Sequence, residues 1–302
     1  MAEITAAMVK ELREQTGAGM MDVKRALTEA GGNMEEATKI LRKKGLAAAT
    51  KKAGRVTSEG AVQAYTSGSV GALVEVNCET DFVARTDQFR QFVDDIAKLI
   101  AKSRAQDVEQ LKNEGSNGET VAQKTQAVIA KIGENVTVRR FARFEAASGA
   151  TIGAYIHAGG KIGVMVELVA NNKGGNAGDA AKDIAMHIAA AEPRFIKRED
   201  VTQKDLDTER EIAREQALKS GKPPNIVEKM VSGKLEKFYG EACLLEQPYI
   251  RNDKQSVRDY LAEAGKQAGC AYTVTRFVRY KLGEGIEKRG DDFAAEVMSY
   301  IK

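Results

Sequence analysis

The chain repeats part of its own sequence, and this duplication limits the folds open to it more than any other feature. The segment TVRRFARF at 137–144 matches TVTRFVRY at 273–280, with Thr, Val, Arg, Phe, Arg and a final aromatic residue in register. Each segment has two apolar stretches upstream that read as the strands of a hairpin with partial alternation. These pairs are GAVQAY (60–65) with ATIGAY (150–155), and VGALVEV (70–76) with IGVMVEL (162–168).

Helical patterns accompany the strands in both copies. One follows the hairpin and another precedes the final strand, with apolar residues at helical spacing. The apolar positions are Phe89, Phe92, Val93, Ile96, Val121, Val128 and Ile132 in the first copy, and Ala181, Ile184, Ala185, Ile188, Val257, Leu261 and Ala264 in the second. We therefore predict an α+β fold with two related subdomains, at 56–146 and at 147–198 with 242–282. Each should be a three-stranded antiparallel sheet with helices on one face.

Three parts lie outside this duplicated core. Residues 1–55 read as three short helices and a polar linker, with Gly45 placed as a glycine that ends the third helix. Residues 199–241 are nearly free of strand patterns and contain a strong break, SGKPPN, which predicts an antiparallel helical hairpin. Residues 283–302 form a C-terminal module that we expect to contain a short helix. The hairpin could mediate self-association, bind another factor or brace the core, and the sequence leaves these alternatives open.

The sequence contains no pattern for catalysis or for cofactor binding. The chain has only two histidines, His157 and His187, which leaves almost no candidates for a histidine metal site or a catalytic triad. Gly-Lys pairs occur, but none has the glycine spacing and the following Ser or Thr of a phosphate-binding loop. His187 lies in an apolar helix and reads as a core residue, whereas His157 lies in a turn and reads as exposed. We therefore expect no catalytic residue, no metal and no cofactor.

Composition narrows the possible partners. The net charge of +3 is small, so no strong basic field favours nucleic acid as the main partner. The cysteines Cys78, Cys243 and Cys270 lack CxxC spacing, which is typical of reduced thiols in a cytosolic protein. No apolar run approaches the roughly 18–20 residues of a membrane span. We expect a cytoplasmic protein that contacts neither nucleic acid nor membrane directly.

The segment CETDFVART at 78–86 ends an apolar strand with an acid and a large aromatic residue side by side. Phe82 either plugs the end of its own sheet or is directed at another molecule, and the pattern alone does not decide. The matching place in the second copy reads VANNK at 169–173, without an acid–aromatic pair. A residue needed to close this fold should occur in both copies. The difference favours a side chain that enters a partner, where a buried aromatic anchor is the usual source of interface energy.

Six segments, in order and spread over nearly the whole chain, resemble the elongation factor Ts family. They are KELREQTGAGMMDVKRAL, VNCETDFVA, KIGENVTVRR, HIAAAEPRFIKREDV, SGKPPNIVEKMVSGKLEKFYGE and GEGIEKRGDDFAAEV. The resemblance implies a guanine-nucleotide exchange factor for elongation factor Tu, the GTPase that delivers aminoacyl-tRNA. It also implies a small N-terminal helical domain, a duplicated core, a coiled-coil arm and a C-terminal module.

The resemblance also assigns roles to residues. Thr80, Asp81, Phe82 and Val83 match the family segment that displaces Mg²⁺ from the nucleotide site of the partner, where the equivalent of Phe82 wedges between helices of the GTPase domain. The other implied partner contacts are Arg13, Met20, Met21, Ile132, Gly133, His157, Phe293 and Val297.

Two other functions compete with exchange. The three N-terminal helices resemble ubiquitin-associated bundles, so the chain could be a protein-binding adaptor without exchange activity, which would not need Asp81 and Phe82. The arginine-bearing strands at 137–144 and 273–280 also suit an RNA-binding translation protein, but no exposed ladder of aromatic residues accompanies them.

Overall fold

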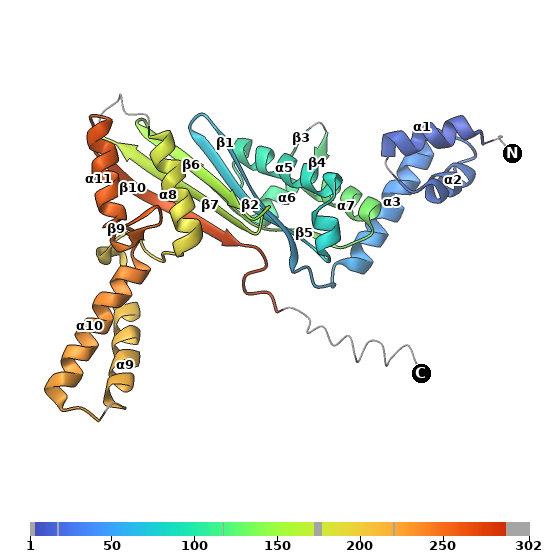
Figure 1. Ribbon diagram of the computed structural model, residues 1–302. Coiled ribbons are helices and arrows are strands. Elements are labelled where there is room, and N and C mark those ends of the chain that lie inside the picture. Colours follow the sequence, from blue (N-terminus) through green and yellow to red (C-terminus); the bar gives the residue numbers. More distant parts are fainter. Residues whose placement is uncertain (1–3, 17, 117, 172–176, 220, 288–302) are drawn as a thin grey trace. The chain divides into compact units, whose positions relative to one another are not determined.

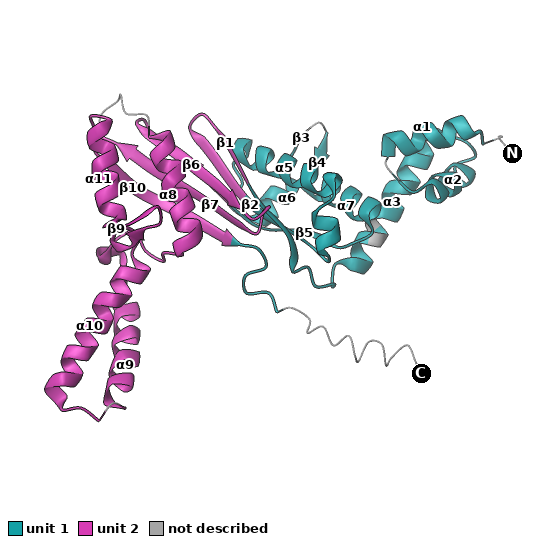
Figure 2. Cartoon of the chain, in the orientation of Figure 1, with its two compact units in different colours: residues 1–63, 74–141, 281–302 teal, residues 64–73, 142–280 magenta. Residues whose placement is uncertain are grey.

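The computed structural model describes residues 4–16, 18–116, 118–171, 177–219 and 221–287 (Figure 1). The fold is mixed, with antiparallel three-stranded sheets and several helices, as expected from the sequence. The chain forms two compact units, shown in Figure 2. Unit 1 consists of 1–63, 74–141 and 281–302, and unit 2 of 64–73 and 142–280.

Three helices form the N-terminal part of unit 1: α1 (Ala6–Thr16), α2 (Met20–Glu29) and α3 (Met34–Lys52). Their small core contains Leu12, Val23, Ala26, Leu27 and Ala37, all fully buried. Asn33 begins α3 by accepting a hydrogen bond from the Glu36 amide at 3.0 Å, which satisfies one of the backbone donors left over at a helix N-terminus.

The expected end of the third helix at Gly45 is wrong. Helix α3 continues through Gly45 and ends with Lys51 and Lys52 in its last turn, where positive charge is favourable. A Cβ added at Gly45 would lie 3.4 Å from the Cβ of Ala130 in α7 (Val121–Ile132). This distance is an ordinary van der Waals contact, so α3 packs against α7 at Gly45. The packing keeps the helix continuous although glycine costs roughly 0.5–1 kcal/mol inside a helix.

The first sheet has the strand order β1-β2-β5. Its strands are β1 (Glu59–Ser67), β2 (Val70–Cys78) and β5 (Val136–Glu145). The accompanying helices and small strands are α4 (Asp81–Ala84), α5 (Asp87–Lys102), α6 (Val108–Asn113), β3 (Gly115–Ser116), β4 (Glu119–Thr120) and α7. Helix α5 has a fully apolar buried face that includes Phe89, Ile96 and Ile100.

The second sheet, in unit 2, has the order β10-β7-β6. Its strands are β6 (Ala150–His157), β7 (Ile162–Ala170) and β10 (Tyr272–Lys281), and β6 pairs antiparallel with β7. Helices α8 (Gly178–Ala191) and α11 (Val257–Gln267) cover one face of the sheet, as Figure 1 shows. The shared core includes Val164, Leu168, Ile184, Ile188 and Leu261. The remaining short elements are η1 (Arg198–Asp200), η2 (Leu244–Glu246), β8 (Pro248–Tyr249) and β9 (Asn252–Ser256).

Between α8 and η2 the chain forms two long helices, α9 (Gln203–Leu218) and α10 (Pro224–Ala242). They lie side by side around a narrow core of Ala213, Ala217, Val227 and Val231 (Figure 1). Pro224 stands at the first position of α10, where its missing N–H removes no helical hydrogen bond. This core is so small that the pair presents mostly polar residues to solvent.

Candidate functional site

The TDFV segment folds into a single helical turn, α4, at the end of β2. Thr80 caps it, with its hydroxyl oxygen accepting a hydrogen bond from the Val83 amide at 3.3 Å. Phe82 projects from this turn with 79% of its surface exposed. That exposure does not fit a plug in the sheet, so the structure leaves the side chain available to another molecule.

The turn is fastened to the loop that follows α7. One carboxylate oxygen of Glu134 accepts hydrogen bonds from the amides of Glu79 and Thr80, at 3.1 and 3.0 Å. The other accepts a hydrogen bond from the Thr80 hydroxyl at 2.6 Å. In return, the Glu79 carboxylate accepts from the Asn135 amide at 2.6 Å and pairs with Arg55 at 3.3 Å. A residue that sequence reasoning missed, Glu134, therefore holds the TDFV turn, although it lies in the quoted KIGEN motif.

The acid beside Phe82 is also fixed in place. Asp81 forms an ion pair with Arg85 at 2.6 Å, and the Asp81 side chain is 41% exposed. Because the pair is partly open to water, it orients Asp81 without contributing much stability. Asp81 and Phe82 thus project from one short turn whose backbone is capped and clamped.

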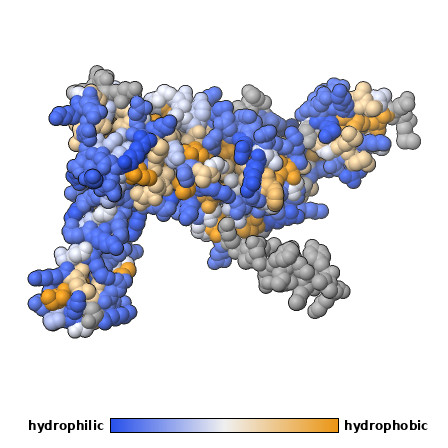
Figure 3. Space-filling view, in the orientation of Figure 1, coloured by the Kyte–Doolittle hydropathy of each residue, from blue (hydrophilic) through white to orange (hydrophobic). Residues whose placement is uncertain are grey.

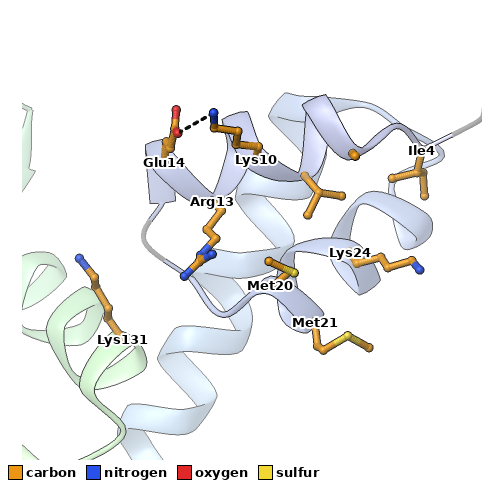
Figure 4. Close-up of a pocket in the computed structure, with 10 residues that line it drawn as sticks. Ile4, Lys10, Arg13, Glu14, Met20, Met21, Lys24 and Lys131 are labelled. Carbon is orange, nitrogen blue, oxygen red and sulfur yellow. Dashed lines mark ion pairs between the residues drawn. The ribbon is translucent and has the colours of Figure 1, made fainter.

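A groove in the N-terminal part of unit 1 contains other predicted contact residues (Figure 4). It has a volume of about 1020 Å³. Its apolar lining includes Ile4, Val9, Met20 and Met21, and its basic lining Lys10, Arg13, Lys24 and Lys131. Figure 4 shows that Met20 and Met21 come from the start of α2 and Arg13 from α1. In Figure 3, hydrophobic surface lies over these N-terminal helices among hydrophilic atoms.

Two exposed methionines of α2 contribute to this groove. Met20 is 56% and Met21 65% exposed, while Val23 and Leu27 on the same helix are fully buried. Met side chains adapt their shape to a partner surface and are common at binding sites. The groove thus combines an apolar lining with four basic side chains and one acid, Glu14, which pairs with Lys10 at 4.0 Å.

Residues 131–134 connect the groove to the TDFV turn along the chain. Lys131 lines the groove, Ile132 ends α7, and Gly133 terminates that helix in the left-handed conformation, with φ of 86°. Glu134 follows at once and binds Thr80. The predicted residues of the TDFV turn, the groove and the α7 terminus therefore all belong to unit 1, and residues 131–134 link them along the chain.

Other predicted site residues are not part of this assembly. His157 belongs to unit 2, where it ends β6, is exposed, and lies 3.1 Å through Nδ1 from the Tyr155 hydroxyl. Phe293 and Val297 lie outside the described residues. His187 is a core histidine as expected: it is fully buried, and its Nε2 lies 2.9 Å from Oε1 of Gln247. Burial lowers the pKa of His187, against a smaller opposing effect of the Gln247 hydrogen bond.

The arginines of the final strands do not merely charge an exposed sheet face. In unit 1, Arg139 and Arg140 both bind the fully buried Glu75, at 2.9 and 2.6 Å. In unit 2, Arg276 binds Glu167 at 2.7 Å. Arg139, Arg140 and Arg276 therefore bind buried carboxylates of the same chain. Arg143 and Arg279 pair instead with the exposed Glu145 and Glu192.

Two further features concern metals and membranes. Among the described residues, no group of three or more His, Cys, Asp or Glu side chains is arranged to hold a metal ion. In the same part of the chain, no helix is both long and apolar enough to cross a membrane.

Comparisons with known proteins agree with this architecture. The family model described as elongation factor TS matches residues 79–284. The elongation factor Ts of Syntrophotalea carbinolica is 51% identical over 304 residues, covering 99% of this chain and all of that protein. The elongation factor Ts of Clostridium perfringens strain SM101 is 50% identical over 297 residues, covering 97% of this chain and 98% of that protein. That of Trichlorobacter lovleyi is 48% identical over 303 residues, with 97% of each chain covered. This chain therefore belongs to the elongation factor Ts family.

Proposed function

We propose that the chain binds elongation factor Tu in its GDP-bound form and promotes release of GDP, so that GTP can bind in its place. The observation that carries this proposal is Phe82, a large aromatic side chain that is 79% exposed on a turn fixed by Thr80 and Glu134. An exposed aromatic ring on a rigid support is suited to act as an interface anchor, because little conformational entropy is lost when it is buried.

The TDFV turn would act on the magnesium site of the partner. Bound Mg²⁺ bridges the nucleotide phosphates and the phosphate-binding loop of a GTPase, so disturbing its surroundings weakens GDP binding. Phe82 would enter between helices of the GTPase domain, and Asp81 would rearrange contacts beside it. No covalent step is required of this chain. A protein that binds the nucleotide-free partner more tightly loosens the nucleotide by thermodynamic reciprocity.

The groove would contact the same GTPase domain through its apolar lining and basic rim. Arg13, Met20 and Met21 would supply this contact, together with Ile132 and Gly133 at the end of α7. His157 would reach another domain of the partner. The C-terminal module, with Phe293 and Val297, would add a further contact.

We also propose the finer organisation that the family implies. Residues 1–55 would form a domain of the ubiquitin-associated type, 56–146 the first core subdomain, and 147–198 with 242–282 the second. The α9–α10 pair would be an inserted coiled-coil arm at 199–241, and 283–302 a C-terminal module. Because its partner serves translation, the chain would act in the cytoplasm as an exchange factor rather than as an enzyme.

The proposal is tested by following release of a fluorescent GDP analogue from elongation factor Tu. The wild-type chain should accelerate release. The double variant Asp81→Ala/Phe82→Ala should slow it by about 30-fold, the effect of losing an anchor of about 2 kcal/mol. Ile250→Ala is a matched control, because Ile250 is also an exposed hydrophobic residue, at 51%, but lies in unit 2 outside the proposed contacts.

Circular dichroism checks that each variant is folded. Equal release with the wild type and the folded double variant would show that Phe82 is not the anchor and would direct attention to Met20, Met21 and His157. If the wild-type chain fails to accelerate release at all, the exchange function itself is refuted and the adaptor alternative gains.

A further inference from the structure

Glu134 holds the TDFV turn, and the second copy of the core has no acid at the matching place in its sequence. In register with the final strands, Glu134 and Asn135 correspond to Cys270 and Ala271. Glu79 at the end of β2 corresponds to Asn171. The two copies can therefore be compared contact by contact at this place.

One contact is common to both copies. The Asn135 amide donates to the Glu79 carboxylate at 2.6 Å, and the Ala271 amide donates to the Asn171 side-chain oxygen at 2.7 Å. In both copies this hydrogen bond joins the residue after the second strand to the residue before the final strand. The sequence of the second copy has no acid–aromatic pair after its second strand. Glu134 is an addition to the first copy, because Cys270 stands in its place in the second.

The three hydrogen bonds of Glu134 fix more than the position of Thr80. The Thr80 hydroxyl donates to Glu134 at 2.6 Å, so its lone pairs remain to accept the Val83 amide at 3.3 Å. The carboxylate thus sets the rotation of the hydroxyl that caps the turn carrying Phe82. On the other side, the Thr80 carbonyl accepts from Cys78 Sγ at 3.2 Å, so the backbone is held at both ends of this residue.

We propose that Glu134 is a positioning residue for nucleotide exchange: it touches neither nucleotide nor magnesium, and it presents Asp81 and Phe82 in the geometry that enters the partner. This inference rests on the proposed exchange function. Without the carboxylate, the turn would sample other conformations, and only a fraction of molecules would present Phe82 correctly. The exchange step should then slow in proportion to that fraction, while the groove of α1 and α2 remains able to bind.

The test uses the full-length variants Glu134→Ala and Glu134→Gln, with Glu109→Gln as a control because Glu109 is a largely exposed glutamate of α6. In the chain alone, hydrogen exchange at the amides of Glu79 and Thr80 should be at least about tenfold faster in Glu134→Ala. Glu134→Gln retains an acceptor oxygen and should be intermediate. Exchange at buried amides of α5 should stay unchanged, which separates release of the turn from unfolding.

The second readout is GDP release from elongation factor Tu as a function of chain concentration. Glu134→Ala should lower the maximal release rate by about tenfold and change the half-saturating concentration by less than about threefold, with Gln intermediate. Equal effects on both quantities would indicate a general loss of structure and overturn the positioning role. Faster amide exchange with an unchanged maximal rate would also overturn it. If wild type does not promote release, the exchange function fails, yet the amide measurement still decides whether Glu134 clamps the turn.

Discussion

The two copies of the duplicated core keep the same buried carboxylate but use it to different extents. Glu75 in β2 and Glu167 in β7 occupy matching positions, and each binds the matching arginine, Arg140 or Arg276. In the second copy the carboxylate also accepts from the Thr275 hydroxyl at 2.6 Å. In the first copy an arginine, Arg139, takes the place of that threonine, and the Gly283 amide donates to Glu75 at 2.8 Å.

In each case the arginine also holds the backbone of a segment that leaves a final strand. Arg276 donates to the carbonyl of Glu145, the last residue of β5, at 2.9 Å. Arg140 donates to the carbonyl of Lys281, the last residue of β10, at 3.1 Å, and pairs with Glu284 at 3.1 Å. Each copy thus contains one matching carboxylate–arginine pair. The additional contacts of the first copy hold the residues that follow β10, Gly283 and Glu284.

We expect the largest difference in stability when residues at the contact between sheet and helix are exchanged between the two copies. Gly153 in β6 corresponds to Gln63 in β1, and a Cβ at Gly153 would lie 2.5 Å from the backbone carbon of Ala181 in α8. Because backbone cannot move aside cheaply, Gly153→Gln should lower the free energy of unfolding by about 3 kcal/mol or more. Gln63→Gly should cost about 1 kcal/mol or less. Urea unfolding measures both, and equal losses would show that the helices of the two copies pack at the same distance.

The buried carboxylates provide the next test. Glu75→Gln removes charge from a side chain that is fully buried, leaving Arg139 and Arg140, themselves 26% and 30% exposed, without their anion. We expect a loss of about 2 kcal/mol, below the range for a completely buried pair because water still reaches the arginines. Glu167→Gln should cost about 1 kcal/mol, since Glu167 has fewer donors and Arg276 is 43% exposed.

A local readout separates the two variants further. Glu75→Gln should speed hydrogen exchange at the Gly283 amide, and Glu167→Gln should leave it unchanged. The reverse pattern, or no change with either variant, would mean that Glu75 does not hold the C-terminal segment.

The pH dependence of the free energy of unfolding tests the role of Glu75 through a smaller effect. Burial alone would raise the pKa of Glu75, but hydrogen bonds from Gly283, Arg139 and Arg140 outweigh it and hold the pKa below its usual 4.5. A carboxylate with a lowered folded-state pKa contributes stability that is complete above its unfolded pKa and is lost as pH falls through the folded value. The free energy of unfolding should therefore decrease as the pH is lowered below about 4.5, and the decrease should be smaller in Glu75→Gln, which has no carboxyl group to protonate at this position. Curves that run parallel would show that Glu75 does not carry this dependence.

The duplication explains which parts of the fold could be predicted. Strands and helices of both copies followed from short apolar patterns, and the match between copies fixed which strands correspond. Gly45 was misread because the packing of α3 on α7 involves Ala130, 85 positions away (130 − 45), and no local pattern reports such a contact.

The same limit applies to the candidate site. The pairing of Glu134 with Thr80 spans 54 residues, and that of Glu75 with Gly283 spans 208. The sequence identified Phe82 as unusual because its counterpart in the second copy is not aromatic, but it left open whether the side chain was buried. Aligning the two copies through the loop before the final strand would have identified Glu134, because the second copy has Cys270 at the corresponding position.

The smallest expected effect on stability concerns Phe82 itself. Because this ring is 79% exposed and has a glycine as its counterpart in the second copy, Phe82→Ala should change the free energy of unfolding by less than about 0.5 kcal/mol. Phe89→Ala, seven positions on (89 − 82) and fully buried in α5, is the matched control and should cost about 3–5 kcal/mol. Urea unfolding of both variants gives the contrast. A loss above about 1 kcal/mol for Phe82→Ala would mean that the ring packs on its own subdomain in solution. It would then be part of the scaffold shared by the two copies, and its absence from the second would need another cause.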